Sequence, residues 1–106
     1  MGQTRPLRRR YTLPALADLT AILDYIAVHS PQRARRVHAR IKPITELLLL
    51  HPRIGRRTND PAIRRMTVTS YPYLIFYEVT ENEVIIHAIR HGARDPSSMP
   101  GADGSA

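Results

Sequence analysis

Arginine and histidine residues gather where the last strand-like run of the chain ends. The stretch "IIHAIRHGARD" (residues 85–95) closes on Arg90, His91 and Arg94 around a glycine. Arginine is permanently charged, and its planar guanidinium pairs bidentately with carboxylates and phosphates. Histidine exchanges a proton near neutral pH. These residue types at this spacing indicate either a surface that binds an anionic partner or a site that cleaves RNA.

RNA cleavage through the substrate's own 2′-hydroxyl needs a base, an acid for the departing 5′-oxygen, and cations that stabilise the phosphorane charge. The chain offers such a set, with His91 for proton transfer and Tyr77 as a further polar group. The cations would be Arg64, Arg90 and Arg94. The residues after Arg94 include no tyrosine, histidine or lysine that could join them. Whether the protein is an enzyme therefore stays open, and binding is favoured over catalysis.

Each of these residues also has a purely structural explanation. Arg64 can pair with Glu78 on a neighbouring strand, an interaction that contributes only ~0.2–1 kcal/mol. Tyr77 shares a strand face with apolar residues, as core residues do. His87 has apolar neighbours, which favours a hydrogen-bonded core histidine. The stretch "RHGARD" would then be a charged strand end that Asp95 closes with an ion pair.

The composition indicates one basic, globular domain. The chain has 106 residues, of which 42% are hydrophobic, enough for one modest core. Sixteen basic residues outnumber nine acidic ones, and the net charge of +7 favours an acidic partner, either nucleic acid or an acidic protein. With no cysteine and no carboxylate–histidine cluster, neither a metal nor another cofactor is expected. No apolar run is long enough for a membrane span, and a cytoplasmic location is expected.

Two amphipathic helices are predicted after a short strand over residues 7–13. Thr12 can cap the first helix, and Pro14 suits its first turn, where a missing N–H costs nothing. The second helix runs from Pro31 to Leu50 with Ser30 as its cap, so the two helices form an antiparallel hairpin. Apolar residues recur every three or four positions in both helices, as Leu16, Leu19, Leu23 and Ile26, and as Ala34, Val37, Ile41, Ile44 and Leu48.

Two residues are expected to disturb regular structure. Pro43 lies inside the second helix, where it removes one hydrogen bond and costs ~3 kcal/mol, so a kink or break is predicted there. Gly92 is expected to adopt a positive φ where the last strand ends, because only glycine does so without steric cost.

The second half of the chain alternates apolar and polar residues, which predicts three strands after a loop over residues 51–61. These strands cover residues 62–68, 73–79 and 84–90. The middle strand is apolar on both faces, so it should be central in the sheet. The predicted fold is α+β with the order β-α-α-β-β-β, in which a helical hairpin packs on a small antiparallel sheet.

The sequence divides the chain into a folded domain and two terminal segments. The folded domain is expected to span residues 7–95. Residues 1–6 form a flexible N-terminus, and residues 96–106, "PSSMPGADGSA", form a disordered C-terminal tail that has few residues to pack.

Four stretches occur in order along this domain, namely "ALADLTAILDYI", "LLLLHPRIGRR", "IRRMTVTSYPYLIFYEV" and "VIIHAIRHGARD". Together they resemble toxins of the RelE/ParE superfamily, the toxin halves of bacterial type II toxin–antitoxin pairs. The resemblance covers about residues 7–95, and its most specific element is "YPYLIFYEV" followed at the right distance by "RHGARD". These residues are more similar to the ParE-like, plasmid-stabilisation branch than to the RelE-like branch.

The resemblance implies the same order of strands and helices, and a heteromeric complex with a small cognate antitoxin that carries an acidic toxin-binding segment. ParE-like toxins poison DNA gyrase, whereas RelE-like toxins cleave mRNA on the ribosome and carry lysines on and after the second helix. Here the region after that helix holds Arg53, Arg56 and Arg57, which cannot lose a proton.

We therefore expect a growth-inhibiting toxin that binds its target, DNA gyrase, and is neutralised by its antitoxin. One alternative is a RelE-like, metal-independent mRNA endoribonuclease that acts on the ribosome. Another is a degenerate toxin that retains only antitoxin binding. The predicted target-binding residues are Arg64, Arg65, Arg90, His91 and Arg94.

Overall fold

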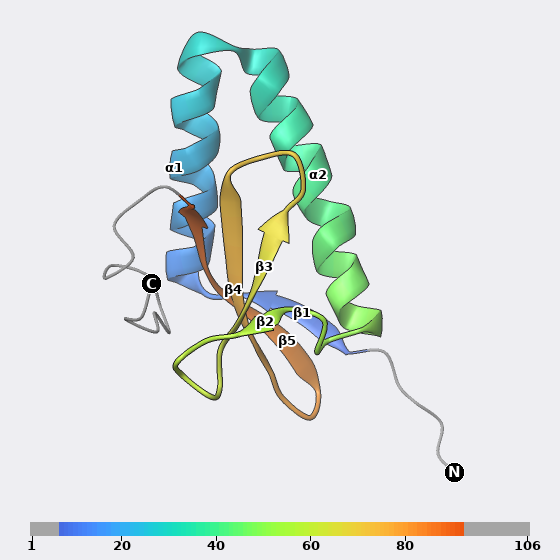
Figure 1. Ribbon diagram of the computed structural model, residues 1–106. Coiled ribbons are helices and arrows are strands. Elements are labelled where there is room, and N and C mark those ends of the chain that lie inside the picture. The colour runs from blue at the N-terminus through green and yellow to red at the C-terminus, as the bar shows by residue number, and fades with distance from the viewer. Residues whose placement is uncertain (1–6, 93–106) are drawn as a thin grey trace.

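The computed structural model describes residues 7–92, which form two helices and five strands. In chain order these elements are β1 (Arg8–Tyr11), α1 (Leu13–His29), α2 (Pro31–Leu50), β2 (Arg56–Arg57), β3 (Arg64–Val68), β4 (Tyr73–Val79) and β5 (Glu83–His91). Figure 1 shows α1 and α2 as a hairpin standing beside the sheet, with the helical connection at the top of the view and β2 near the bottom. The predicted helical hairpin is confirmed.

The sheet is mixed, and its strand order is β1-β5-β4-β3-β2. The strands β2 to β5 pair antiparallel, but β1 pairs with β5 in parallel, so the sheet is not wholly antiparallel. The added strand β2 lies in the segment predicted as loop. Alternation predicts a strand but not its direction, and β1 is parallel because the helical hairpin separates it from the other strands. The α+β class and the central position of β4 are confirmed.

Both helices begin at the side-chain caps that the sequence predicts. Thr12 accepts a hydrogen bond from the Ala15 N–H at 3.2 Å, and Ser30 accepts one from the Arg33 N–H at 3.1 Å. Each cap satisfies an N–H that has no partner within its own helix. The predicted bounds of α2 are confirmed, and α1 begins directly after Thr12.

Of the kink or break predicted at Pro43, the break does not occur, because α2 continues through this residue. Pro43 is exposed, so its ring lies away from the packed side of the helix. The buried Thr45 accepts a hydrogen bond from Arg9 of β1 at 2.8 Å and donates one to the Lys42 carbonyl at 2.9 Å. These contacts and the apolar packing of α2 keep the helix continuous, since tertiary packing outweighs the loss of one backbone hydrogen bond.

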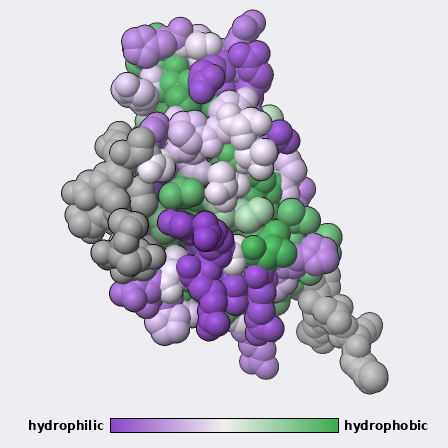
Figure 2. All heavy atoms as spheres, in the orientation of Figure 1, coloured by the Kyte–Doolittle hydropathy of each residue, from purple (hydrophilic) through white to green (hydrophobic). Residues whose placement is uncertain are grey.

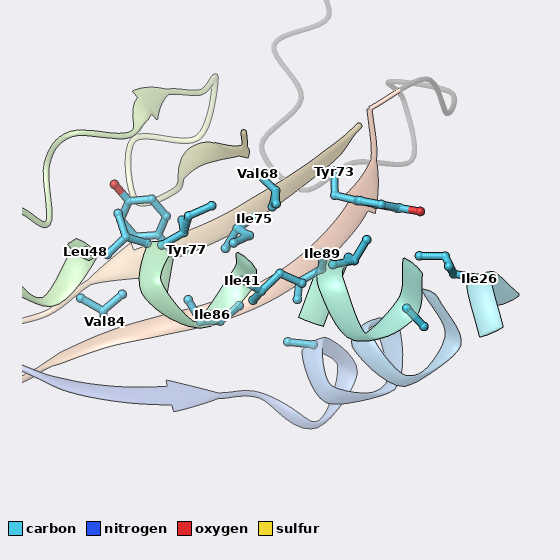
Figure 3. Close-up of a cluster of buried hydrophobic side chains, with 14 residues drawn as sticks. Ile26, Ile41, Leu48, Val68, Tyr73, Ile75, Tyr77, Val84, Ile86 and Ile89 are labelled. Carbon is cyan, nitrogen blue, oxygen red and sulfur yellow. The ribbon is translucent and has the colours of Figure 1, made fainter. Parts of the chain in front are cut away.

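The main core lies between the helical hairpin and one face of the sheet (Figure 3). The whole predicted stripe of α2 is buried, whereas α1 contributes less, because Leu16 of its predicted stripe is 44% exposed. The buried members of this core on the strands are Val68, Tyr73, Ile75, Tyr77, Val84, Ile86 and Ile89.

The other face of the sheet is not covered by helices and carries a smaller apolar cluster. Phe76 of β4 and Ala88 of β5 are buried there with Ile63, which precedes β3, and Leu74 packs partly against them. We call this side the uncovered face. Side chains that flank the small cluster are accessible to a partner.

Residues 1–6 and 93–106 lie outside the described residues, and with them the predicted N-terminal segment, the C-terminal tail and the side chain of Arg94. The positive φ predicted for Gly92 is not found. Among non-glycine residues 7–92, a positive φ occurs at Ser70, where φ is 75° in the reversal between β3 and β4. No helix in the described part of the chain is long and apolar enough to cross a membrane.

Candidate functional site

Tyr77 of β4 is fully buried, and its hydroxyl joins the sheet to the loop after α2. The hydroxyl donates a hydrogen bond to the Pro52 carbonyl at 2.7 Å and accepts one from the Gly55 N–H at 2.9 Å. Burial raises the pKa of Tyr77 above its usual value of 10.0, against the lowering effects of the Gly55 N–H and the Arg64 charge. Figure 3 shows the ring at one end of the core. This hydroxyl therefore supports the fold.

Arg64 of β3 lies opposite Tyr77 in the strand register and holds the same loop. Its Nη1 donates to the Arg53 carbonyl at 3.1 Å and to the Gly55 carbonyl at 2.9 Å. The alternative of an Arg64–Glu78 ion pair is not observed, because Glu78 pairs with another residue. Together Arg64 and Tyr77 fix the segment 52–55, which we call the clamped loop.

Replacing Tyr77 by phenylalanine should lower the free energy of unfolding by about 1–3 kcal/mol, since it leaves the Gly55 N–H and the Pro52 carbonyl without their partner. The control is Tyr25→Phe, because Tyr25 is 72% exposed and its hydroxyl makes no hydrogen bond to any residue from 7 to 92. Chemical denaturation of the purified full chain measures both changes. Equal effects from the two substitutions would show that the clamp contributes nothing.

The raised pKa of Tyr77 predicts a loss of stability in alkali. Above pH 10.0 the tyrosine ionises in the unfolded chain before it does so in the folded one, so the folded state binds more protons. The contribution of Tyr77 to the free energy of unfolding is therefore fully present below pH 10.0, and it is lost as the pH rises through the folded-state pKa. The stability difference between wild type and Tyr77→Phe should shrink in that range, which denaturation at several alkaline pH values checks.

Arg90 of β5 is tied to the first helix. Its Nη1 lies 2.6 Å from Oδ2 of Asp18 on α1, and the same oxygen accepts a hydrogen bond from the Ile89 N–H at 3.0 Å. β1 ends at Tyr11, so α1 runs along the part of the β5 edge that β1 leaves unpaired. Asp18 thereby satisfies an edge N–H and neutralises an arginine at once. This contact links residues more than 70 positions apart, so no local pattern could have predicted it.

His91 is the last residue of β5, opposite Tyr73 in the register. The two rings pack edge to face with centroids 5.4 Å apart, and the side chain of His91 is half-buried. Its neighbour in the predicted set, Arg94, lies outside the described residues.

The strand register divides the predicted target-binding residues between two faces, because neighbouring residues of a strand point to opposite sides. Arg64 and His91 lie opposite two tyrosines of the main core, so they belong to the side of the helices. Arg65 lies opposite Phe76, and Arg90 lies opposite Leu74, on the uncovered face. The predicted set therefore does not converge on one point.

A histidine–carboxylate pair that the sequence did not predict lies on the uncovered face. Nε2 of His87 is 2.8 Å from Oε1 of Glu78, and each side chain is about one third exposed (32% and 33%). The strand pairing skips His87, since Phe76 pairs with Ala88 and Tyr77 with Ile86, which marks a β-bulge that redirects this side chain. His87 is hydrogen-bonded as expected, but to a carboxylate at the surface instead of within the core.

Metal-binding clusters are not seen within residues 7–92, where no three histidine, aspartate or glutamate side chains come close enough together to hold an ion.

Residues 9–96 match the family described as "ParE toxin of type II toxin-antitoxin system, parDE". The chain belongs to this family of ParE toxins. The superfamily resemblance seen in the sequence is confirmed, and the protein is the toxin of a type II toxin–antitoxin system, which acts with an antitoxin partner.

Relatives of this ParE-family toxin carry names from both branches of the superfamily. The chain is 44% identical over 84 residues to "Toxin RelE2" of Caulobacter vibrioides, covering 79% of this chain and 93% of that protein. It is 34% identical over 79 residues to "Putative toxin Y4kP" of Sinorhizobium fredii, covering 74% and 82%. A solved chain of the "Chromosomal ParDE TA system from P. aeruginosa" has a TM-score of 0.72 at 25% identity, covering 83% of this chain and 98% of that one.

Proposed function

We propose that this ParE-family toxin arrests growth by binding DNA gyrase, without catalysing a reaction itself, and that a cognate antitoxin with an acidic segment neutralises it. The match to the ParE family supports gyrase as the target class. The observation that carries the choice of binding over catalysis is that internal contacts already engage the groups that RNA cleavage would use.

Three of the candidate catalytic residues have such contacts. The Tyr77 hydroxyl is buried with two backbone partners, and the Arg64 guanidinium holds two carbonyls of the clamped loop. Arg90 is paired with Asp18 at 2.6 Å. A general acid or base must reach the proton that it transfers, and a catalytic cation must reach the phosphorane. These side chains would have to leave the fold to do so, which favours an inhibitor over a nuclease.

An antitoxin with an acidic amphipathic segment fits the charge and the exposed apolar residues of this chain. The net charge of +7 attracts carboxylates. The apolar stripe of α2 is buried against the sheet, so docking would use other apolar side chains. Figure 2 shows a hydrophobic area over the C-terminal end of α2, and the exposed large apolar residues there are Leu47, Leu50 and Ile54.

The ribosome-dependent nuclease is a second candidate because of the His87–Glu78 pair. A histidine held by a carboxylate is a common arrangement for proton transfer, and this pair is partly exposed. The name of the relative "Toxin RelE2" is consistent with this alternative. The pair serves equally as a cross-strand contact that closes the bulge, so we rank cleavage second.

Induction of the chain in a bacterial host separates these functions. We expect filamentous cells, gyrase-linked DNA breaks and intact messages, all suppressed by co-expression of the antitoxin gene. The purified full chain should inhibit supercoiling of a relaxed plasmid by gyrase. His87→Gln should leave this inhibition intact, since the proposed function requires no proton transfer.

Cuts in translated messages would contradict the proposal if His87→Gln or His91→Gln reduced them by orders of magnitude while supercoiling stayed normal. If induction does not slow growth but the chain binds its antitoxin tightly, the protein is a degenerate toxin. Both outcomes reject gyrase inhibition by this chain.

A further inference from the structure

Four arginines face one another across the short pairing of β2 with β3. Arg56 lies directly opposite Arg65, and Arg57 lies opposite Arg64. Like charges directly opposite on neighbouring strands are destabilising, because their side chains project to the same face a few ångströms apart. Only Arg64 has backbone partners that compensate for its charge, namely two carbonyls of the clamped loop. The arrangement therefore carries a cost that the fold itself does not explain.

Most of the other basic side chains of the sheet have internal partners, and Arg8 at the far end of β1 is an exception among residues 7–92. Arg10 pairs with Glu83 at 3.1 Å, Arg90 pairs with Asp18 at 2.6 Å, and His87 contacts Glu78 at 2.8 Å. In contrast, a second set of arginines has guanidinium groups that form no ion pair or hydrogen bond with any residue from 7 to 92. We call this set the β2 arginine cluster, and its members are Arg53, Arg56, Arg57 and Arg65. Arg10 and Arg90 therefore support the fold, whereas the guanidinium groups of the β2 arginine cluster are available to a partner and lie close together in the chain and in the sheet.

The clamped loop and β2 hold the cluster at the edge of the sheet, where Arg56 and Arg65 project to the uncovered face and Arg57 projects to the other side of the edge strand. Tyr77 and Arg64 bond to the backbone of residues 52–55, directly before the exposed Arg56 and Arg57. Gly55 is packed so closely that no side chain fits at this position. Preorganised side chains lose less entropy on binding, so they bind a matching ligand more tightly. Figure 2 shows hydrophilic residues over the part of the sheet where β2 lies.

We propose that the β2 arginine cluster binds the phosphate backbone of duplex DNA. Several positive charges this close together are best neutralised by a partner with a high density of negative charge. Duplex DNA is such a partner, because it carries one negative charge per ~1.7 Å of its axis. Guanidinium groups pair bidentately with phosphate oxygens, and such contacts position a protein without selecting a sequence. The site rests on the proposed function and deepens it, since DNA gyrase acts on duplex DNA.

Fluorescence anisotropy of the full chain with a short labelled duplex tests the site. If four arginines contact phosphates, affinity should fall roughly 100-fold between 50 and 200 mM salt. The double variant Arg56→Gln/Arg57→Gln should reduce the slope of log affinity against log salt by about 2. The matched control is Arg35→Gln/Arg36→Gln, an exposed pair on α2. Each variant lowers the net charge from +7 to +5 (7 − 2), so a general charge effect would change both equally.

Loss of DNA affinity in the β2 variant, with the α2 control and both melting temperatures near wild type, is the expected result. Equal losses in both variants, or no duplex binding at 50 mM salt, would overturn the site. The DNA site would also be overturned if the chain bound single-stranded RNA or polyglutamate more tightly than the duplex and this binding required Arg56 and Arg57. That result would favour an RNA partner or an acidic protein partner.

The gyrase assay distinguishes this inference from the proposed function. If wild type inhibits supercoiling but DNA binding does not depend on the cluster, the DNA site is wrong and gyrase inhibition stands. If the cluster binds DNA but gyrase is unaffected, the proposed function fails and the DNA site stands. If both hold, Arg56→Gln/Arg57→Gln should weaken gyrase inhibition at least tenfold, and the α2 control should not.

Discussion

Gly55→Ala should lower the free energy of unfolding by about 3 kcal/mol, because it combines overpacking with the loss of the tyrosine hydroxyl's hydrogen bonds. A Cβ atom at this position would lie 2.4 Å from Oη of Tyr77, 2.7 Å from Cε1 of the same ring and 2.8 Å from the Arg65 carbonyl oxygen. The ring is buried and the carbonyl belongs to β3, so neither can move without disturbing the sheet. The clamped loop must therefore shift.

Urea denaturation of the full chain measures this effect, with Gly92→Ala as the control. A Cβ at Gly92 would come no closer than 3.4 Å to another atom, the Pro72 carbonyl oxygen, and the residue is exposed. We expect the control to change stability by less than about 1 kcal/mol. A stable Gly55→Ala protein would mean that the loop does not pack against Tyr77 as described.

Removing the carboxylate of Asp18 is the second substitution with a large expected effect. Asp18→Ala should lower the free energy of unfolding by roughly 2–4 kcal/mol, since it removes a charge-assisted hydrogen bond to Arg90 and leaves the Ile89 N–H without its partner. Both contacts are short, at 2.6 and 3.0 Å, and they attach α1 to the edge of β5.

Thermal and urea denaturation of matched variants checks this expectation. Asp24→Ala is the control, because Asp24 lies on the same helix and is exposed, and it should change stability by no more than about 0.5 kcal/mol. Asp18→Asn keeps an oxygen that can accept a hydrogen bond from the Ile89 N–H. Its loss of stability should therefore be smaller than that of Asp18→Ala and larger than that of Asp24→Ala. If Asp18→Ala matched Asp24→Ala, Arg90 would be free to act on the target, as the sequence predicted.

The local structure of this protein could be predicted from its sequence because the signals lie within a few residues of one another. The caps at Thr12 and Ser30 act on N–H groups three positions away. The stripe of α2 repeats every three or four residues, and the alternation in β4 shows that both of its faces are apolar. The superfamily resemblance also rests on contiguous stretches of sequence. Helix bounds, the central strand and the family were therefore accessible without a structure.

Only the tertiary structure decided the direction of β1 and the role of each charged side chain. Periodicity shows which residues face the core, but it does not say which distant group an arginine will meet. The partner of Arg90 is 72 positions away in Asp18, and Tyr77 bonds to a loop 22 to 25 positions earlier. In the sequence, Arg56 and Arg65 cannot be distinguished from Arg90. In the fold, Arg90 pairs with a carboxylate, whereas no carboxylate among residues 7–92 pairs with Arg56 or Arg65. A permanently charged guanidinium binds an outside partner most readily where the fold leaves it unpaired, and long-range packing sets that condition.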